Sequence, residues 1–321
     1  METRTLDRPP SILPLYARAA APLIPGASLL PFVPGGGDGV PELELVLPEV
    51  RPEADAVAAY ARVCGFALRD RLAPTYPHVL AFPLHLAIMA DGNFPFGAVG
   101  LVHVENRIVQ HRPIAIGEEL NLVVRATKLQ PHPRGRTFGL TTEARTGGEV
   151  AWESTSTMLR RGGGSKAASS RGKDDAAAAE PREAAPADGS AADGTGPAAA
   201  AEWRLGGDLG RRYAAVSGDR NPIHIHSLTA KPLGFPSAIA HGMWTKARCL
   251  AALEPRLPEA FAVDVRFRKP ILLPARVEFT SDFEGEEIDF AVRDAKRQTP
   301  HLEGHLQPTE AKPNSGRKKA E

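Results

Sequence analysis

The chain contains little cysteine: two thiols, Cys64 and Cys249, in 321 residues. They belong to no CxxC pair and to no Cys/His cluster with zinc spacing, which excludes a disulfide framework and a cysteine-based metal site. Free thiols are typical of a reducing compartment, so we expect a cytoplasmic protein.

Uninterrupted apolar runs are also missing. The stretch Ser11–Gly36 is apolar but carries five prolines, which would break any continuous helix. A second apolar stretch, Val79–Val102, is interrupted by His85, Asp91 and Asn93. Neither stretch is expected to span a membrane.

Neither sign of charge is in excess, because 39 Lys and Arg residues balance 38 Asp and Glu residues. This balance argues against a nucleic acid or another large polyanion as the partner of the whole protein. The last six residues, GRKKAE, are locally basic, but a short tail of this kind is usually only solvated.

Residues 162–201 contain no aromatic and no large aliphatic side chain. Such a segment cannot offset the entropy of ordering, so it is interpreted as a disordered linker. The predicted organisation is therefore a Pro-rich N-terminal segment (1–40), a folded repeat (41–161), the linker (162–201), a second folded repeat (202–308) and a disordered basic tail (309–321).

The two folded parts show the same order of sequence signals. YARVCGF (60–66) and YAAVSGD (213–219) both end a helical pattern at a glycine, but the second has Asp219 where the first has Phe66. In each part an apolar helix follows, and then a run of strand-like alternations. This order predicts an α+β fold and a duplicated domain. The predicted helices are 54–63, 82–90, 209–216 and 242–253, and the predicted strands are 101–114, 119–129, 136–145, 149–159, 262–271, 276–283, 287–292 and 301–306.

The second copy alone carries a pattern suited to acid–base chemistry. Asp219 and His224 flank Asn221-Pro222, and the proline prevents the preceding helix from continuing. The resulting turn can aim a carboxylate and an imidazole at one water molecule. The alternative is that Asp219 is an ordinary turn former.

The helix that begins at Gly242 adds a second element. Its first N–H groups have no partner within the helix and can stabilise a developing oxyanion. Together with the acid–base pair, this arrangement suits addition of water to an α,β-unsaturated thioester, or its removal. Ser217 and His241 are expected to support the turn and the helix start. A metal bound by Asp219, His224, His226 and His241 is conceivable, but no HxxxH or HExxH spacing supports one, and none is predicted.

YAAVSGDRNPIH (213–224) followed by GFPSAIAHGM (234–243) resembles the MaoC-like hydratases, the (R)-specific enoyl-CoA hydratase or hydratase 2 group, over residues 203–307. The resemblance implies that Asp219 and His224 are the acid–base pair, that the backbone of Gly242 is the oxyanion donor and that Asn221 holds the turn. FPFGAVGLVHVENRI (94–108) looks like the non-catalytic repeat of two-domain members. The resemblance to this family implies a double hot-dog fold, in which each repeat wraps an antiparallel sheet around a central helix.

The activity implied is that of a hydro-lyase of fatty-acid metabolism, which interconverts trans-2-enoyl-CoA and (3R)-3-hydroxyacyl-CoA. It requires no metal or redox cofactor, and coenzyme A enters only as part of the substrate. The first repeat is expected to provide packing and an apolar acyl site. The residues predicted to bind the acyl group are Phe66, Phe82, Phe94, Phe96, Gly234 and Phe235, while Arg266, Arg268 and Lys269 are candidates for meeting the phosphates of coenzyme A.

Several alternatives stay open from the sequence. A hot-dog thioesterase would aim water at the carbonyl carbon. A non-catalytic acyl-thioester binding subunit of a fatty-acid or polyketide complex would keep the turn without turnover. The thioester can be one of acyl carrier protein, and the chain can be a monomer with an internal pseudo-dimer or a homodimer.

Overall fold

The computed structural model describes residues 1–21, 37, 39–162 and 201–310. Most of the predicted linker and of the predicted basic tail, and residues 22–36 and 38 of the predicted Pro-rich segment, lie outside the described residues. The described ends of the linker adjoin strands directly, because Gly162 follows one strand and Ala201 begins the next.

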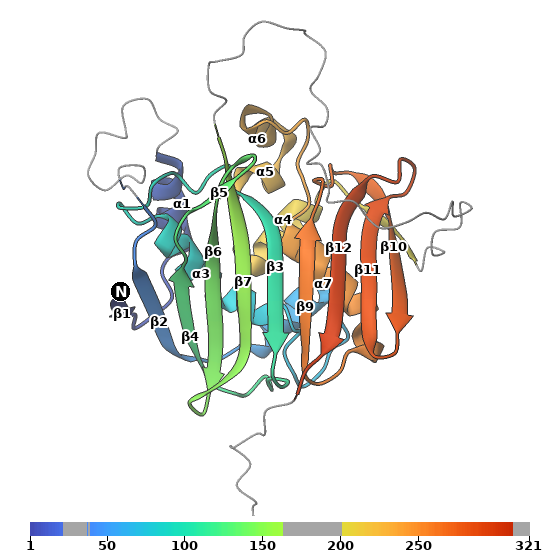
Figure 1. Ribbon diagram of the computed structural model, residues 1–321, viewed down its shortest axis with the longest axis horizontal. Helices are drawn as coiled ribbons and strands as arrows, with labels where there is room; N and C mark the ends of the chain where they lie inside the picture. The colour runs from blue at the N-terminus through green and yellow to red at the C-terminus, as the bar shows by residue number, and fades with distance from the viewer. Residues whose placement is uncertain (22–36, 38, 163–200, 311–321) are drawn as a thin grey trace, which may run out of the picture.

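The strands form a single sheet in the order β1-β2-β4-β6-β7-β3-β9-β12-β11-β10-β8 (Figure 1), with the short β5 paired to β6. All pairs are antiparallel except β1 with β2. The bounds are β1 Glu2–Thr5, β2 Leu43–Val50, β3 Val102–Gln110, β4 Leu120–Ala126, β5 Gln130–His132, β6 Gly135–Thr146, β7 Glu149–Arg161, β8 Ala201–Leu205, β9 Phe261–Phe267, β10 Ala275–Glu284, β11 Glu287–Asp294 and β12 Pro300–Pro308.

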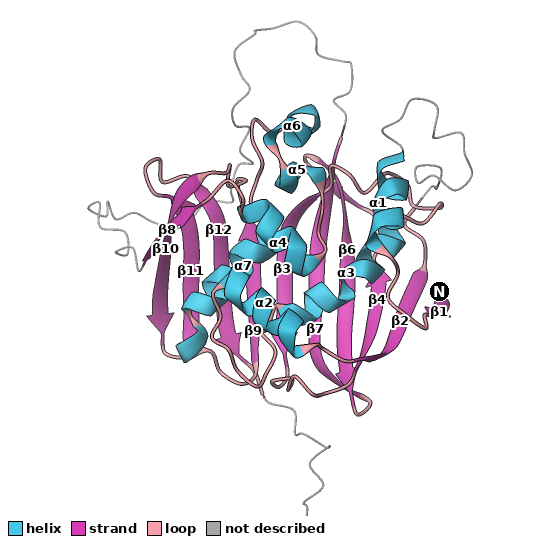
Figure 2. Cartoon of the chain, turned by 180° about the vertical axis from the view of Figure 1, so that it is seen from behind, coloured by secondary structure: helices cyan, strands magenta, loops and turns pink. Residues whose placement is uncertain are grey.

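The helices gather on one face of this sheet (Figure 2). Their bounds are α1 Ile12–Ala20, α2 Ala54–Cys64, α3 Tyr76–Met89, α4 Leu209–Ser217, α5 Pro222–Ile225, α6 Ser227–Ala230 and α7 Gly242–Ala252. As predicted, α2 and α4 end at equivalent glycines, and both adopt the left-handed conformation, Gly65 with φ 85° and Gly218 with φ 75°. Glycine carries no Cβ penalty there, so each helix stops at the same point of the repeated phrase.

The central helix of each repeat, α3 or α7, is buried along most of its length. The prediction of two apolar helices, each against its own half of the sheet, is confirmed, but α3 begins at Tyr76 rather than at residue 82. The sequence predicts a loop before residue 82 because Pro77 is typical of turns. That proline lies in the first turn of the helix, where its missing N–H has no acceptor to lose.

The two repeats join where β3 pairs with β9, with Ile108 opposite Val263. Lys246 on α7 is completely buried beneath this junction. Its Nζ donates to the carbonyl and side-chain oxygens of Asn106 on β3 and to the carbonyl of Val263 on β9. Three acceptors match the three N–H bonds of an ammonium group. One continuous sheet with a central helix in each half is the double hot-dog architecture that the sequence predicts.

The N-terminal segment differs from expectation. Pro14 does not prevent helix formation, because it occupies the first turn of the nine-residue α1. This helix packs against α3, so part of the segment predicted as a separate Pro-rich piece belongs to the folded body. Strands β1, β2, β5 and β8 were not predicted either. β1 and β8 are short strands at the two edges of the sheet and β5 has three residues, whereas the eight-residue β2 lies between β1 and β4.

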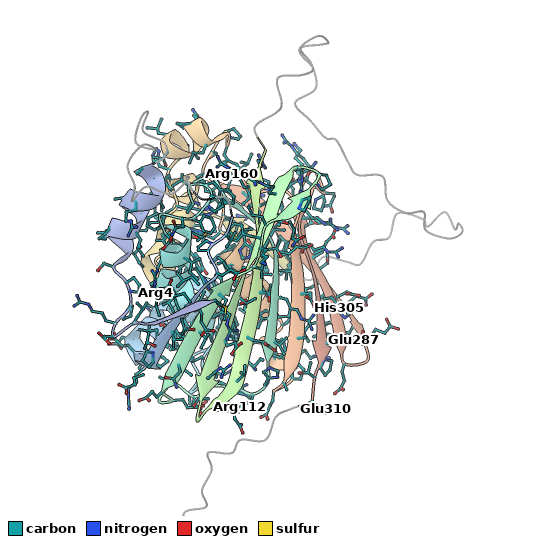
Figure 3. All side chains as sticks on the ribbon, turned by 60° about the vertical axis from the view of Figure 1, so that its left-hand side comes forward. Arg4, Arg112, Arg160, Glu287, His305 and Glu310 are labelled. Carbon is teal, nitrogen blue, oxygen red and sulfur yellow. The ribbon has the colours of Figure 1, made fainter. Side chains whose placement is uncertain are left out.

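The opposite face of the sheet is polar. Figure 3 shows His305 and Glu287 close together on β12 and β11, where His305 Nε2 lies 3.8 Å from Glu287 Oε2. Arg107 on β3 pairs with Asp264 on β9 across the junction of the repeats. In the described part of the chain, no helix has the length and apolar composition needed to cross a membrane.

Candidate active site

The turn after α4 fixes the carboxylate of Asp219. The backbone N–H of Asn221 donates to Asp219 Oδ1 at 3.1 Å, and the N–H of Asp219 donates to Ser217 Oγ at 3.2 Å. Asn221 Oδ1 then accepts from the N–H of Ile223 at 3.4 Å and caps α5, whose first residue is Pro222. Asn221 and Ser217 therefore hold the turn, as the sequence suggests.

An unpredicted residue completes this turn from the far end of the chain. Tyr16 on α1 donates its hydroxyl proton to Asp219 Oδ1 at 2.8 Å and accepts the N–H of Arg220, also at 2.8 Å. Asp219 Oδ1 thus receives two hydrogen bonds, which leaves Oδ2 to interact with a substrate or water. The orientation of the carboxylate depends on the N-terminal helix.

His224 is buried, and its hydrogen bond defines which nitrogen is basic. Nδ1 lies 2.8 Å from the carbonyl oxygen of Ile239, an acceptor only, so Nδ1 carries the proton. Nε2 is then the basic nitrogen. The backbone of His224 lies close to α4 at Gly210, where a Cβ would lie 1.8 Å from the carbonyl oxygen of His224. Only glycine allows this approach.

His241 occupies the N-cap position of α7, but its side chain makes no capping hydrogen bond and instead contacts Asp219 and His224. Its Nε2 donates to the backbone carbonyl of Asp219 at 3.0 Å and lies 3.8 Å from Asp219 Oδ2. Its ring stacks on that of His224, with the centroids 3.7 Å apart, and packs against Tyr213 at 4.8 Å. His241 therefore helps to fix the positions of Asp219 and His224 through one hydrogen bond and one ring contact.

The side chains of Asp219, His224 and His241 converge, with one ligand-type atom of each within 4.8 Å of the others. This spacing leaves room for one water between the carboxylate and the imidazole. It would also suit a metal ion, and His224 keeps a free Nε2 that could bind one, but His241 Nε2, which lies 3.8 Å from Asp219 Oδ2, carries the proton that it donates to a backbone carbonyl and has no lone pair for a metal. The contacts favour acid–base chemistry. His226 is not part of the group, because its Nδ1 accepts the N–H of Leu228 at the start of α6.

The surroundings of Asp219 and His224 give the two groups different charge states at neutral pH. Burial acts to raise the pKa of Asp219, but His241, His224, the N–H of Asn221 and the Tyr16 hydroxyl outweigh it and lower that pKa. Burial lowers the pKa of His224, against the opposing effect of the Asp219 carboxylate. At neutral pH the site therefore holds a carboxylate beside a neutral imidazole, one group to orient water and one to accept its proton.

Gly242 is the first residue of α7 and lines the same cavity. Its N–H has no acceptor within the helix and lies at the positive end of the helix dipole. A Cβ here would lie 3.0 Å from the ring of Phe267, so a side chain would crowd the approach to this N–H. The helix start is a suitable oxyanion donor.

The cavity extends from the catalytic turn into the first repeat. One face of α3 lines it at intervals of three or four residues, through His78, Phe82, His85 and Met89. The opposite wall comes from the first-repeat strands, including Leu140, Met158 and Leu159. Each repeat thus forms part of one cavity.

Two of the predicted acyl-binding residues, Phe82 and Phe235, line this cavity, and four do not. Phe66 lies in a separate hollow with Leu72 and Phe261, because it follows α2 just as Asp219 follows α4 and so occupies the corresponding place in the other repeat. The prediction that Phe66 contacts the acyl chain is therefore corrected.

Phe94 and Phe96 pack against Phe138 with ring centroids 5.2 and 5.9 Å away, in the hydrophobic core rather than in the cavity. Their alternation with small residues after α3 reflects core packing. Gly234 precedes the cavity-lining Phe235 but does not itself line the cavity, and its φ of 87° favours glycine at this position.

Sequence reasoning missed Tyr16, Gly210 and the histidines of the first repeat. Tyr16 and Gly210 carry no local motif, since each matters through a contact distant in sequence. His78 and His85 had a signal, because their spacing with Phe82 places all three on one face of a helix.

Comparisons with known proteins identify a matching family and relatives of this chain. A family model described as a MaoC like domain matches residues 194–304. The chain is 37% identical over 294 residues to 3-hydroxyacyl-thioester dehydratase X of Mycobacterium tuberculosis, covering 91% of this chain and 96% of that protein. It is 39% identical over 70 residues to 3-hydroxybutyryl-CoA dehydratase of Methylorubrum extorquens, covering 21% of this chain and 45% of that protein.

The crystal structure of HtdX from Mycobacterium tuberculosis superposes with a TM-score of 0.70 at 34% identity, covering 83% of this chain and all of that one. The similarity therefore extends over both repeats and is not limited to the part that carries Asp219 and His224.

Proposed function

The chain belongs to the MaoC-like dehydratase family, and on this basis we propose that it is a hydro-lyase that interconverts trans-2-enoyl and (3R)-3-hydroxyacyl thioesters. The observation that carries the proposal is the convergence of Asp219 and His224 on a cavity that also contains the start of α7. An acid–base pair next to an oxyanion donor is what addition of water to a conjugated thioester needs.

In the hydration direction, the Asp219 carboxylate orients a water molecule and His224 Nε2 accepts its proton. The water oxygen forms a bond to C3, and the π electrons move toward the thioester oxygen. The N–H of Gly242 stabilises that enolate oxygen, and the proton held by His224 then passes to C2. Dehydration runs through the same steps in reverse, so one pair of residues serves both directions.

Exposed cations at the cavity support coenzyme A as the carrier. The cavity is lined by Arg134 and Arg161 of the first repeat and by Arg268 and Lys269 of the second, all four exposed. Arg268 also binds Glu303, whereas Arg266 turns to Glu105 on the outer face of the sheet and does not line the cavity. Cations from both repeats suit the phosphates of coenzyme A. The phosphopantetheine arm of acyl carrier protein, with its single phosphate, is the alternative.

We expect the reaction to require no metal or redox cofactor, because every step above is a proton transfer between groups of this chain and the substrate. Dialysis against a chelator should leave turnover unchanged. Loss of turnover that added metal restores would contradict this expectation.

One chain contributes both walls of the cavity, so we propose that a monomer is sufficient for activity. Light scattering on active enzyme would test this. The two thiols are free and buried, which suits the reducing cytoplasm, and we expect the enzyme to be located there.

The experiment that tests the function is an assay of the purified chain with crotonyl-CoA and longer trans-2-enoyl-CoA thioesters. Loss of enoyl absorbance with a (3R) product supports the hydro-lyase. Release of free thiol would instead indicate a thioesterase, and tight binding without turnover would indicate an acyl-thioester binding subunit.

A further inference from the structure

The first repeat brings three histidines to the wall of the catalytic cavity. His78 and His85 lie on α3, His103 lies on β3, and all three line the cavity with Asp219 and His224. The ring of His78 lies 4.9 Å from that of His85 and 6.3 Å from that of His103, measured between centroids. An otherwise apolar acyl site does not need this group.

Two of these imidazoles have a buried nitrogen without a partner. Among the described residues, no hydrogen bond reaches His78 Nδ1 or His103 Nε2, although both atoms are shielded from solvent. His78 itself is only 8% exposed. His85 differs, because its Nε2 bonds to Thr142 Oγ1 at 2.7 Å. A buried polar atom without a partner costs stability, so its presence at a cavity wall requires an explanation.

Their location places these two side chains next to the reacting part of a substrate. Phe82, one turn from His78 on α3, lies against Gly218, the residue before Asp219. His103 packs on Phe267, with centroids 5.0 Å apart, and the Phe267 ring in turn covers Gly242. The two histidines therefore border the reaction centre on its first-repeat side.

The charge state limits what these histidines can bind. Burial, together with neighbouring cationic groups such as Lys246, lowers the pKa of His78 to about 4 and that of His103 to about 3. Burial also lowers the pKa of His85. Neutral imidazoles do not attract a carboxylate or a phosphate by charge. Each offers one N–H donor and one acceptor, which matches a hydroxyl group or a ketone.

We propose that His78 and His103 form a polar subsite that selects acyl groups with a hydroxyl or keto oxygen beyond C3. The subsite rests on the proposed hydro-lyase function and defines its substrate class. The oxygen would bond to His78 Nδ1, His103 Nε2 or both, and would supply the partners that these atoms lack. An alkyl chain would leave them unpaired. The enzyme then prefers an oxygenated acyl thioester to its alkyl analogue.

A pair of substrate series tests this preference on the wild-type enzyme. Trans-2-hexenoyl-CoA is compared with its 4-, 5- and 6-hydroxy analogues, and kcat/KM is measured for each. We expect at least one hydroxy analogue to exceed the alkyl substrate by about tenfold or more. Equal or lower values for all three hydroxy analogues would overturn the subsite. Absence of turnover with every substrate would instead refute the proposed function, so the two failures are distinguishable.

Variants then assign the preference to these residues. In His78→Leu and His103→Leu the ratio of hydroxy to alkyl kcat/KM should fall toward one. His78→Asn keeps a polar atom near Nδ1 and His103→Gln keeps one near Nε2, so both should retain part of the ratio. An unchanged ratio in the leucine variants, or an equal loss for both substrates, would overturn the assignment. The assignment would also be overturned by a crystal structure of the wild type with the preferred analogue in which His78 Nδ1 and His103 Nε2 bind water rather than the oxygen of the acyl group.

Discussion

The hydroxyl oxygen of Tyr16 lies 2.8 Å from Oδ1 of Asp219, across 203 positions of sequence. The same oxygen accepts the N–H of Arg220. A residue of the N-terminal helix thus orients the carboxylate proposed to hold the reacting water. Although Tyr16 belongs to neither predicted repeat, the geometry of the site depends on it.

Replacing Tyr16 by phenylalanine should lower kcat about tenfold with little change in KM, because a hydrogen bond to a charged carboxylate is lost. The hydroxyl helps to lower the pKa of Asp219, so its removal should raise that pKa. Since Asp219 must be ionised, the acid limb of the pH–kcat profile should move to higher pH. Stopped-flow or steady-state hydration across pH measures both effects.

The matched control is Tyr76→Phe, which removes a phenol oxygen from α3 at a position that does not line the cavity. Its pH profile should match that of the wild type. A Tyr16→Phe profile identical to the control would show that Tyr16 only packs against the turn.

The sequence predicted correctly those helices, strands and turns whose pattern is set by neighbouring residues. The glycines after α2 and α4, the apolar helices and the strands β3, β4, β6, β7 and β9 to β12 are encoded by nearby residues, so periodicity finds them. Helix α1 and strands β2 and β8 are stabilised by contacts distant in sequence. For example, β8 has five residues and is paired along its length with β10. Length and composition alone do not indicate such elements.

The candidate site divides in the same way. Asp219, Asn221 and His224 share one proline-stiffened turn, so their proximity follows from local sequence, whereas the orientation of the carboxylate and the imidazole depends on contacts with Tyr16 and Ile239. Which aromatic residues reach the cavity depends on how two repeats pack, and that packing places Phe66 in the other hollow. Tyr16 and Gly210 matter through single tertiary contacts, which no sequence pattern records.

Asp219→Asn should leave the fold intact and reduce turnover of crotonyl-CoA by about 10²–10⁴-fold, the usual contribution of general acid–base catalysis. His224→Gln should cause a loss of the same order, and the double variant should lose little more, because the two residues act on one water. Circular dichroism checks the fold. Near-normal hydration by either single variant, or losses that multiply in the double variant, would contradict a joint role.

Gly210→Ala should reduce kcat by about 10²-fold, although residue 210 acts only through the position of His224 and does not line the cavity. A Cβ at this position would lie 1.8 Å from the carbonyl oxygen of His224, so the turn that carries the imidazole must move. Gly207→Ala is the matched control, because a Cβ there meets nothing within 4 Å. Equal activity of the two variants would show that α4 does not set the position of His224.

The stability of the protein should fall as the pH is lowered from about 6.5, because buried histidines must become protonated on unfolding. Burial lowers the folded-state pKa of His78 to about 4 and that of His103 and His241 to about 3. The unfolded chain binds protons at these residues from about pH 6.5 downward, so the stabilisation is complete above that pH and is lost as the pH falls toward the folded values. Each such histidine contributes a slope that approaches about 1.4 kcal/mol per pH unit only between its folded and unfolded pKa values and is smaller near pH 6.5. Urea unfolding at pH 7, 6 and 5 should therefore show a smaller dependence of stability on pH for His78→Asn than for the wild type. If the unfolding free energy of His78→Asn and of the wild type changed equally with pH, His78 would gain its proton in the folded protein as easily as in the unfolded chain. The imidazole would then not be held neutral at the cavity wall, which contradicts a requirement of the proposed subsite.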